Sequence, residues 1–237
     1  MMQTLLLRLR ELFAVSLWLV FTGSTTAAAA ASLDTLISKD AAGGLRAALS
    51  QGIDTAVAQL GANNGFLNDP KVSIPLPPAL QKAEGALRLI GMGRDADNLK
   101  AAMNHAAEAA VADAKPVFKQ ALQRMTVADA KAILTGGDDA GTQYFRGATS
   151  VQLTAKFRPI VERETAKLKL ASRYDQYAGK AADLGLIKAQ DANLNDYVTA
   201  KALDGLFSRI ADEERAIRKD PLGQASVLIK KVFGAVR

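Results

Sequence analysis

The stretch ADNLKAAMNHAAEAAV, residues 96–111, carries the pattern that decides the fold class. Its apolar residues recur every three or four positions, as they do on one face of an α-helix. This face consists of Ala96, Leu99, Met103, Ala106 and Ala110. Because alanine side chains are small, a neighbouring helix can approach such a face closely. The stretch therefore predicts an amphipathic helix that is packed tightly against other helices.

The same spacing recurs along most of the chain, and the alternating pattern of strands is nearly absent. Further helices are expected over about 45–60, 80–90, 117–125, 126–134, 139–170, 173–184, 199–219 and 223–233. Glycine and proline separate these stretches, as is typical of tight turns between helices. The predicted fold is all-α, a compact single-domain bundle of roughly eight short helices over residues 32–237.

Local signals mark two helix starts, one bend and one long connection. Thr126 and Asp129 resemble a capping box, and Pro116 suits the first turn of a helix. Pro159 is expected to bend the stretch 139–170. The connection of about 62–78 is rich in Pro, Asn and Gly, and 72–74 suits a short extended segment before Pro75. We expect its apolar side chains to pin it to the body of the domain; they are Phe66, Leu67, Val72, Ile74 and Leu76.

Residues 1–31 have the order of parts that is typical of a secretory signal peptide. Arg8 and Arg10 precede an apolar run, and a small-residue tract ending at Ala31 follows it. The run has about ten residues, short of the roughly 20 that span a bilayer, which disfavours the alternative of an uncleaved anchor. Cleavage is expected after Ala29 or Ala31, releasing a soluble periplasmic protein. Without cysteine there is no lipid-modified N-terminus, so no stable membrane anchor is expected after cleavage.

Composition argues against several classes of function. The chain has 30 Lys and Arg against 24 Asp and Glu, a net charge of +6, and only 5% aromatic residues. Because charges of both signs are interspersed, nucleic-acid binding is not expected. The chain has no cysteine and one histidine, His105. This excludes thiolate metal sites and multi-histidine catalytic groups, so no metal or cofactor is predicted.

The most concentrated polar segment runs from Thr135 to Arg146. Its candidate ligand-binding residues are Gly136, Gly137, Asp138, Asp139, Gln143, Tyr144 and Arg146. A glycine turn there could present carboxylates and a helix N-terminus to a polar ligand or a cation. The structural alternative is that Gly136 ends one helix and that Asp138 or Asp139 caps the next.

Asn104 and Glu108 form a second candidate group, because residues four apart share one helix face. The alternative is a structural hydrogen bond for Asn104 and a solvated Glu108. His105 has no catalytic partner at a recognisable spacing. The charged run from Arg209 to Arg218, with Glu214 and Arg218 at the favourable i,i+4 spacing, predicts a solvated helix face.

Several segments together resemble a family of exported bacterial proteins, domain of unknown function 4197. They are GFLNDP (65–70) with IPLP (74–77), NHAAEAAV (104–111) with AKP (114–116), ILTGGDD (133–139) with QYFR (143–146), and YVT (197–199) with KALDGLF (201–207). The resemblance covers about residues 33–234. It implies a cell-envelope setting and one all-helical domain, and it implies no activity, substrate or cofactor.

Three classes of function remain open from the sequence. The leading hypothesis is a non-enzymatic envelope protein that binds a small polar ligand or an envelope protein. The second is a metal-independent hydrolase or lyase that uses a carboxylate pair, Glu108 and Asp139. The third is a helical protein of membrane surfaces, suggested by the basic and apolar terminus around Lys230, Lys231 and Phe233.

Overall fold

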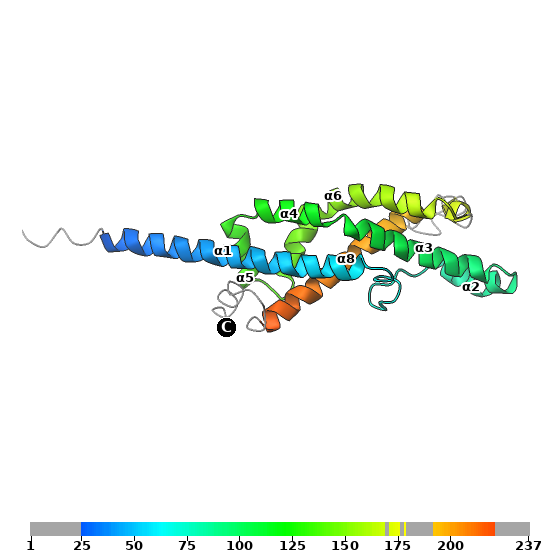
Figure 1. Ribbon diagram of the computed structural model, residues 1–237, viewed down its shortest axis with the longest axis horizontal. Helices are drawn as coiled ribbons and strands as arrows, with labels where there is room; N and C mark the ends of the chain where they lie inside the picture. The colour runs from blue at the N-terminus through cyan, green and yellow to red at the C-terminus, as the bar shows by residue number, and fades with distance from the viewer. Residues whose placement is uncertain (1–24, 169–170, 176–177, 179–191, 221–237) are drawn as a thin grey trace, which may run out of the picture. The chain divides into compact units, whose positions relative to one another are not determined.

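A computed structural model describes residues 25–168, 171–175, 178 and 192–220 of the chain. Within this part the helices are α1 (Thr25–Leu60), α2 (Pro78–Leu89), α3 (Gly93–Ala112), α4 (Lys115–Arg124), α5 (Val127–Thr135), α6 (Ala140–Thr165) and α8 (Leu194–Lys219). Figure 1 follows their order along the chain. The described residues form no strand, and the predicted all-α class is confirmed.

The chain divides into two compact units, Met1–Asp40 and Ala41–Arg237. The sites described below lie in the second unit. Of the predicted signal peptide, residues 1–24 lie outside the described residues, as do the predicted helix 223–233 and most of 173–184. In the described part of the chain, no helix is both long and apolar enough to cross a membrane.

Helix α3 lies in the core of the second unit. It packs against α6 and α8, and α6 packs in turn against α8, α4 and α5. All five residues of its predicted apolar face are buried. Phe118 of α4 joins the core through edge-on contacts, with its ring centroid 5.4 Å from that of Phe145 and 6.1 Å from that of Phe207. The alanine-rich pattern therefore identified a helix of the core.

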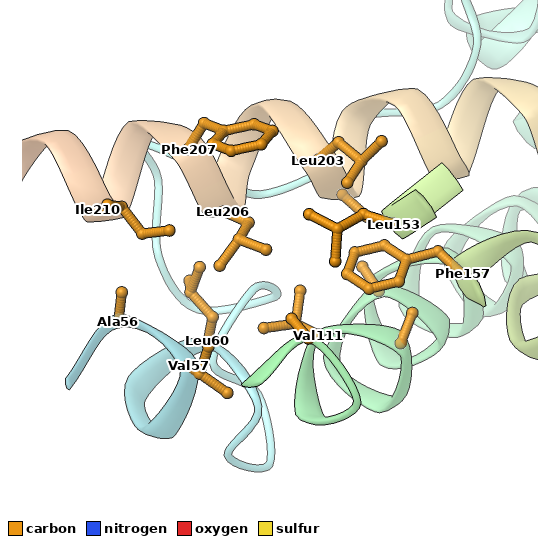
Figure 2. Packing of buried hydrophobic residues seen from close by; sticks show 14 of the residues in the cluster. Ala56, Val57, Leu60, Val111, Leu153, Phe157, Leu203, Leu206, Phe207 and Ile210 are labelled. Carbon is orange, nitrogen blue, oxygen red and sulfur yellow. The ribbon is translucent and has the colours of Figure 1, made fainter. Parts of the chain in front are cut away.

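The C-terminal half of α1 contributes one side of the same core. Its predicted face is buried from Leu45 to Leu60. Figure 2 shows Val57 and Leu60 in one cluster with Val111 of α3, and Leu206 and Ile210 point toward them from α8. The core thus joins helices that are far apart in the sequence.

Helix α2 lies close to the predicted bounds. None of its residues is buried, and just beyond it Ile90 is 69% exposed. The helix packs mainly on α3, and a single neighbour does not cover the whole helix. The apolar spacing therefore identified the helix, while its exposure is set by its few neighbours.

The helix ends confirm most of the local signals. The Thr126 hydroxyl accepts from the Asp129 N–H at 3.1 Å and the Asp129 carboxylate accepts from the Thr126 N–H at 2.9 Å, which completes the capping box. Pro116 lies in the first turn of α4. Helix α8 begins at Leu194 rather than 199, because Asn193 caps it by accepting from the Asp196 N–H at 3.1 Å.

Candidate functional site

Glu108, one of the predicted site residues, is hydrogen-bonded to the loop that follows α1. It is 5% exposed. Its Oε1 accepts from the N–H of Phe66 at 3.1 Å and of Leu67 at 3.3 Å, and its Oε2 accepts from the N–H of Asn64 at 3.1 Å. His105 Nδ1 lies 2.9 Å from Oε2. The expectation of a solvated Glu108 was wrong, because the turn formed by the loop aims its N–H groups at this carboxylate.

Asn104 pairs with the same loop one turn earlier on α3. Its Oδ1 accepts from the Ile74 N–H at 2.8 Å, and its Nδ2 donates to the Ile74 carbonyl at 2.9 Å. The side-chain amide thus satisfies both backbone groups of Ile74. The expectation of an extended segment over 72–74 was wrong for Val72, which lies in a turn and donates its N–H to the Asp69 carbonyl at 3.2 Å. Of the two alternatives for Asn104, the structure shows the structural hydrogen bond.

Residues 61–77, which we call the pinned loop, are also fixed to α8. Asp69 forms an ion pair with Arg209, and Lys71 forms one with Asp212. Phe66 is fully buried against Gly205, where an added Cβ would lie 2.7 Å from the Phe66 ring. The predicted pinning by apolar side chains is confirmed for Phe66, Val72, Ile74 and Leu76, while Leu67 is half-buried.

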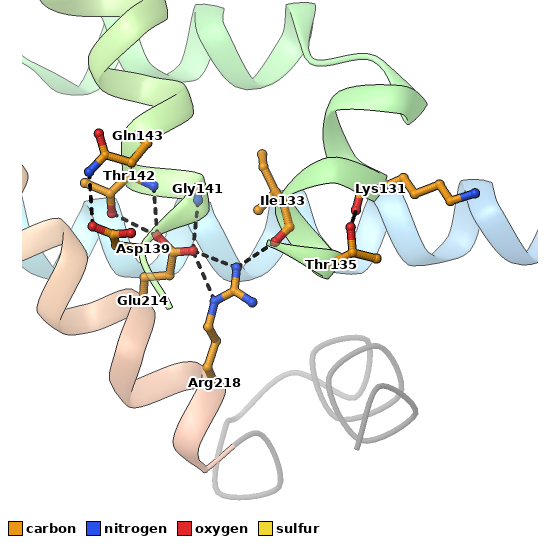
Figure 3. Close-up of polar contacts among 9 residues, drawn as sticks. All are labelled: Lys131, Ile133, Thr135, Asp139, Gly141, Thr142, Gln143, Glu214 and Arg218. Carbon is orange, nitrogen blue, oxygen red and sulfur yellow. Dashed lines mark hydrogen bonds and ion pairs between the residues drawn. The ribbon is translucent and has the colours of Figure 1, made fainter. Parts of the chain in front are cut away.

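The N-terminus of α6, the second predicted binding feature, already binds a carboxylate of the same chain, that of Glu214 (Figure 3). Glu214 accepts from the N–H of Gly141 at 2.9 Å, and from the N–H of Thr142 at 2.8 Å and its hydroxyl at 2.9 Å. Arg218 donates to this carboxylate at 2.8 Å and to the Ile133 carbonyl at 2.9 Å. A carboxylate at a helix N-terminus occupies the position where a ligand anion would bind.

This arrangement corrects two expectations. The run from Arg209 to Arg218 is not a purely solvated face, because Glu214 is buried and Arg218 is largely buried beside it. Asp139 stands at the N-cap position of α6 without making a side-chain cap. The capping carboxylate comes instead from α8, a distant part of the chain, and no local spacing could indicate it.

The glycine turn itself is a helix end with exposed carboxylates. Gly136 ends α5, and its N–H donates to the Ile133 carbonyl at 3.3 Å. A Cβ on Gly136 would lie 2.8 Å from that of Ala140, so the turn has no room for a side chain there. Gly137 and Asp138 are exposed, and Asp139 accepts from Gln143 Nε2 at 3.0 Å.

Tyr144 points into the protein rather than toward a ligand. Its hydroxyl donates to the Ala121 carbonyl at 3.3 Å, and its ring lies 5.5 Å from that of Phe145. Burial raises the pKa of Tyr144 above its ordinary value.

Glu108 and Asp139, the predicted catalytic pair, are held in separate hydrogen-bond networks. The described residues contain no group of three or more His, Cys, Asp or Glu that could hold a metal ion.

Arg146 lies on a different surface, in a groove between α6 and α8 of about 350 Å³. We call it the α6–α8 groove; its lining is Arg146, Ser150 and Thr154 of α6 and Asp196, Thr199, Ala200, Leu203, Asp204 and Phe207 of α8. Arg146 Nη1 lies 3.2 Å from Asp204 Oδ1, and its guanidinium carbon lies 4.6 Å from the centre of the Phe207 ring. Of the predicted site residues, Arg146 alone belongs to the described lining of this groove.

The hydroxyl groups of the groove differ in their hydrogen bonding. Ser150 donates to the Arg146 carbonyl at 2.6 Å, and Thr154 donates to the Ser150 carbonyl at 2.8 Å. The Oγ1 of Thr199 is buried and has no hydrogen-bond partner. Such a hydroxyl destabilises the folded chain, because it has lost water without gaining a partner. Sequence reasoning missed Thr199, and a threonine within a helical pattern gives no signal of this kind.

Two of the segments that carry the family resemblance, 133–146 and 197–207, reach the groove. Arg146 lies on one side of it, and Thr199, Leu203, Asp204 and Phe207 lie on the other. No curated protein and no solved structure shows a significant match to the chain. The family described as "Protein of unknown function (DUF4197)" matches residues 35–234. The match covers most of the chain and includes the pinned loop and both sides of the groove, and the chain therefore belongs to this family.

Proposed function

We propose that this protein is an exported, non-enzymatic binding protein that takes a small polar ligand in the α6–α8 groove. The observation that carries the proposal is the groove itself. Charged, hydroxyl and apolar side chains meet there around about 350 Å³ of open space, a volume at the lower end of small-molecule sites.

The other candidate residues favour the groove as the binding site, because their polar groups are already used within the fold. Asn104 and Glu108 hold the pinned loop, and Glu214 holds the start of α6. A ligand that recruited these groups would have to replace hydrogen bonds that maintain the fold. Arg146 and Asp204, in contrast, are about half exposed at the groove, so a ligand can reach them without opening the core.

The proposal of export rests on residues 1–31, and it has a direct test. The full chain is expressed in a bacterium, and the protein is recovered from the periplasmic fraction. N-terminal sequencing is expected to find a chain that begins at residue 30 or 32. Recovery of the uncleaved chain from the cytoplasm would contradict the proposal.

Binding is tested by amide chemical shifts of the isotope-labelled full chain. The probes are 1,8-diaminooctane, suberate, glucose and phosphate, which cover the main classes of small polar ligand. At least one is expected to shift residues 146–154 and 196–207 saturably. The variant Arg146→Ala should weaken that binding.

Arg163→Ala is the matched control, because Arg163 is also an exposed, ion-paired arginine of α6 but lies outside the groove lining. It should bind the same probe as tightly as the unaltered chain. The proposal fails if none of the four probes perturbs the groove, or if both arginine variants weaken binding equally.

A further inference from the structure

The α6–α8 groove has a carboxylate toward each end of its α8 wall. Asp196 and Asp204 are eight residues apart, which corresponds to about 12 Å along the axis of α8. They are 47% and 58% exposed at the side chain. Arg158 Nε lies 2.8 Å from Oδ1 of Asp196, and Arg146 Nη1 lies 3.2 Å from Oδ1 of Asp204. Both ion pairs use Oδ1, so Oδ2 of each carboxylate can accept from a ligand.

The wall between the two carboxylates is apolar. Ala200 and Leu203 line it beside Thr199, and Phe207 continues the apolar face beyond Asp204. Ala200, Leu203 and Phe207 share one face of α8 because they follow the i,i+3 and i,i+4 spacing. Leu203 and Phe207 are themselves buried. This floor suits a hydrocarbon chain that runs along the helix from one carboxylate to the other.

The opposite wall offers acceptors rather than donors. Ser150 and Thr154 use their hydroxyl hydrogens on carbonyls of their own helix, which leaves the oxygen lone pairs toward other partners. Arg146 is the cation of the lining, and Asp204 and the Phe207 ring already engage it. A ligand rich in N–H donors therefore fits this wall better than an anion does.

Thr199 provides an independent sign that the groove is built for a partner. Thr149, Thr154 and Thr165 of α6 each donate to the carbonyl four residues earlier. Thr199 lies near the start of α8 and lines the groove, yet its buried Oγ1 has no partner. A ligand in the groove can supply the partner that this hydroxyl lacks.

We infer that the α6–α8 groove binds a linear diamine or polyamine, extended along α8 with one ammonium group at Asp196 and another at Asp204. This inference rests on the proposed binding function and names its ligand class. The about 12 Å between the carboxylates along the helix is close to the separation of the terminal nitrogens in extended 1,8-diaminooctane. A dicarboxylate of the same length would bring like charges together at both ends.

The experiment measures affinity against ligand length in the full chain. Titrations use 1,8-diaminooctane, 1,3-diaminopropane, butylamine and suberate at low salt, where contacts between exposed charges are least screened. The long diamine is expected to bind about five- to tenfold more tightly than the short diamine or butylamine, because it alone reaches both carboxylates.

Two variants locate the ends of the ligand. Asp196→Asn and Asp204→Asn should each weaken 1,8-diaminooctane about fivefold and remove its advantage over butylamine. Glu213→Gln is the matched control, because it removes a carboxylate of α8 that lies outside the groove lining, and it should bind like the unaltered chain. Circular dichroism checks that the variants fold; if one does not, the length series on the unaltered chain still decides.

The outcomes separate this inference from the proposed function. Equal affinity for long and short amines overturns the inference. Binding of suberate in the groove without binding of the diamines also overturns it, while the proposed function stands. If none of the small probes of either experiment perturbs the groove, both proposals fail.

Discussion

The pinned loop and the α6–α8 groove both involve polar side chains of helices, but in opposite ways. At the pinned loop, Asn104 and Glu108 of α3 form hydrogen bonds to backbone groups of residues 64–74. In the groove, Asp196 and Asp204 are about half exposed and Thr199 has a buried hydroxyl with no partner. Polar groups that are buried and bonded to one another stabilise the fold, whereas polar groups that stay exposed in a groove can be reached by a ligand.

The comparison also shows why a polar pattern does not by itself identify a binding site. Asn104 and Glu108 looked like ligand-binding residues because polar side chains in the middle of a helix need partners. Their partners turned out to be a loop of the same chain. Thr199 and Asp204 were not among the predicted site residues, because threonine and aspartate on a helix are ordinary surface residues.

The largest expected effect is the loss of the apolar anchor of the pinned loop. Phe66→Ala should lower the free energy of unfolding by about 3–5 kcal/mol, because a fully buried ring is replaced by a cavity. Urea denaturation followed by circular dichroism measures the change. Val151→Ala, at a position that is 86% exposed, is the control and should cost less than about 0.5 kcal/mol.

The next effect concerns the side-chain amide that bonds both backbone groups of Ile74. Asn104→Ala should lower the free energy of unfolding by about 2–3 kcal/mol, because the N–H and the carbonyl of Ile74 lose their partners. Hydrogen exchange of the Ile74 amide should accelerate at the same time. An unchanged exchange rate would mean that the loop does not depend on Asn104.

One arginine of the pinned loop region and one of the groove can be compared directly. Arg209 is about three-quarters buried at the pinned loop, and Arg146 is nearly half exposed at the groove. Arg209→Ala should cost about 1–2 kcal/mol more unfolding free energy than Arg146→Ala, because its ion pair with Asp69 is less solvated. Equal losses in urea denaturation would remove the distinction between the two regions.

A smaller effect of opposite sign is expected at the unpaired hydroxyl. Thr199→Val should raise the free energy of unfolding by about 0.5–1 kcal/mol, because it removes a buried polar atom that has no partner and keeps the shape of the side chain. Thr149→Val is the control, since its hydroxyl donates to the Phe145 carbonyl at 2.7 Å. A loss of stability in Thr199→Val would show that the hydroxyl serves the fold.

The smallest effect concerns the cap of α5, which is local, whereas α6 is capped by the distant Glu214. The Thr126 backbone N–H and hydroxyl lower the pKa of Asp129 below its ordinary value of 3.8. Its contribution to stability is therefore complete above pH 3.8 and is lost as the pH falls through the lower pKa of the folded state. A pH titration of the Asp129 carboxyl resonance measures this, and an unshifted midpoint would contradict the capping geometry.

Much of the helical framework was predictable because its causes are local. The apolar face of α3, the Thr126 capping box and the proline at the start of α4 each lie within a few residues of the structure that they produce. The apolar side chains of the loop also marked it as pinned. The exposure of Ile90 just beyond α2 could not be predicted in this way, because burial depends on the neighbouring helices and not on the helix itself.

The candidate site was predictable only through Arg146. Glu214 could not be identified as the cap of α6, because Gly141 and Thr142 are more than 70 residues earlier in the chain. Asp204 and Thr199 become parts of a groove only when α6 lies alongside α8. No residue spacing within α6 or within α8 indicates that the two helices lie side by side.

The sequence by itself determined the all-α class, the positions of most helices in the second unit and the membership of a family of unknown function. These follow from periodicity and capping, which act over one or two turns of helix. Only the tertiary structure decided which polar residues serve the fold and which face a groove. Hydrogen bonding and desolvation depend on which groups meet in space, and here those groups come from distant segments of the chain.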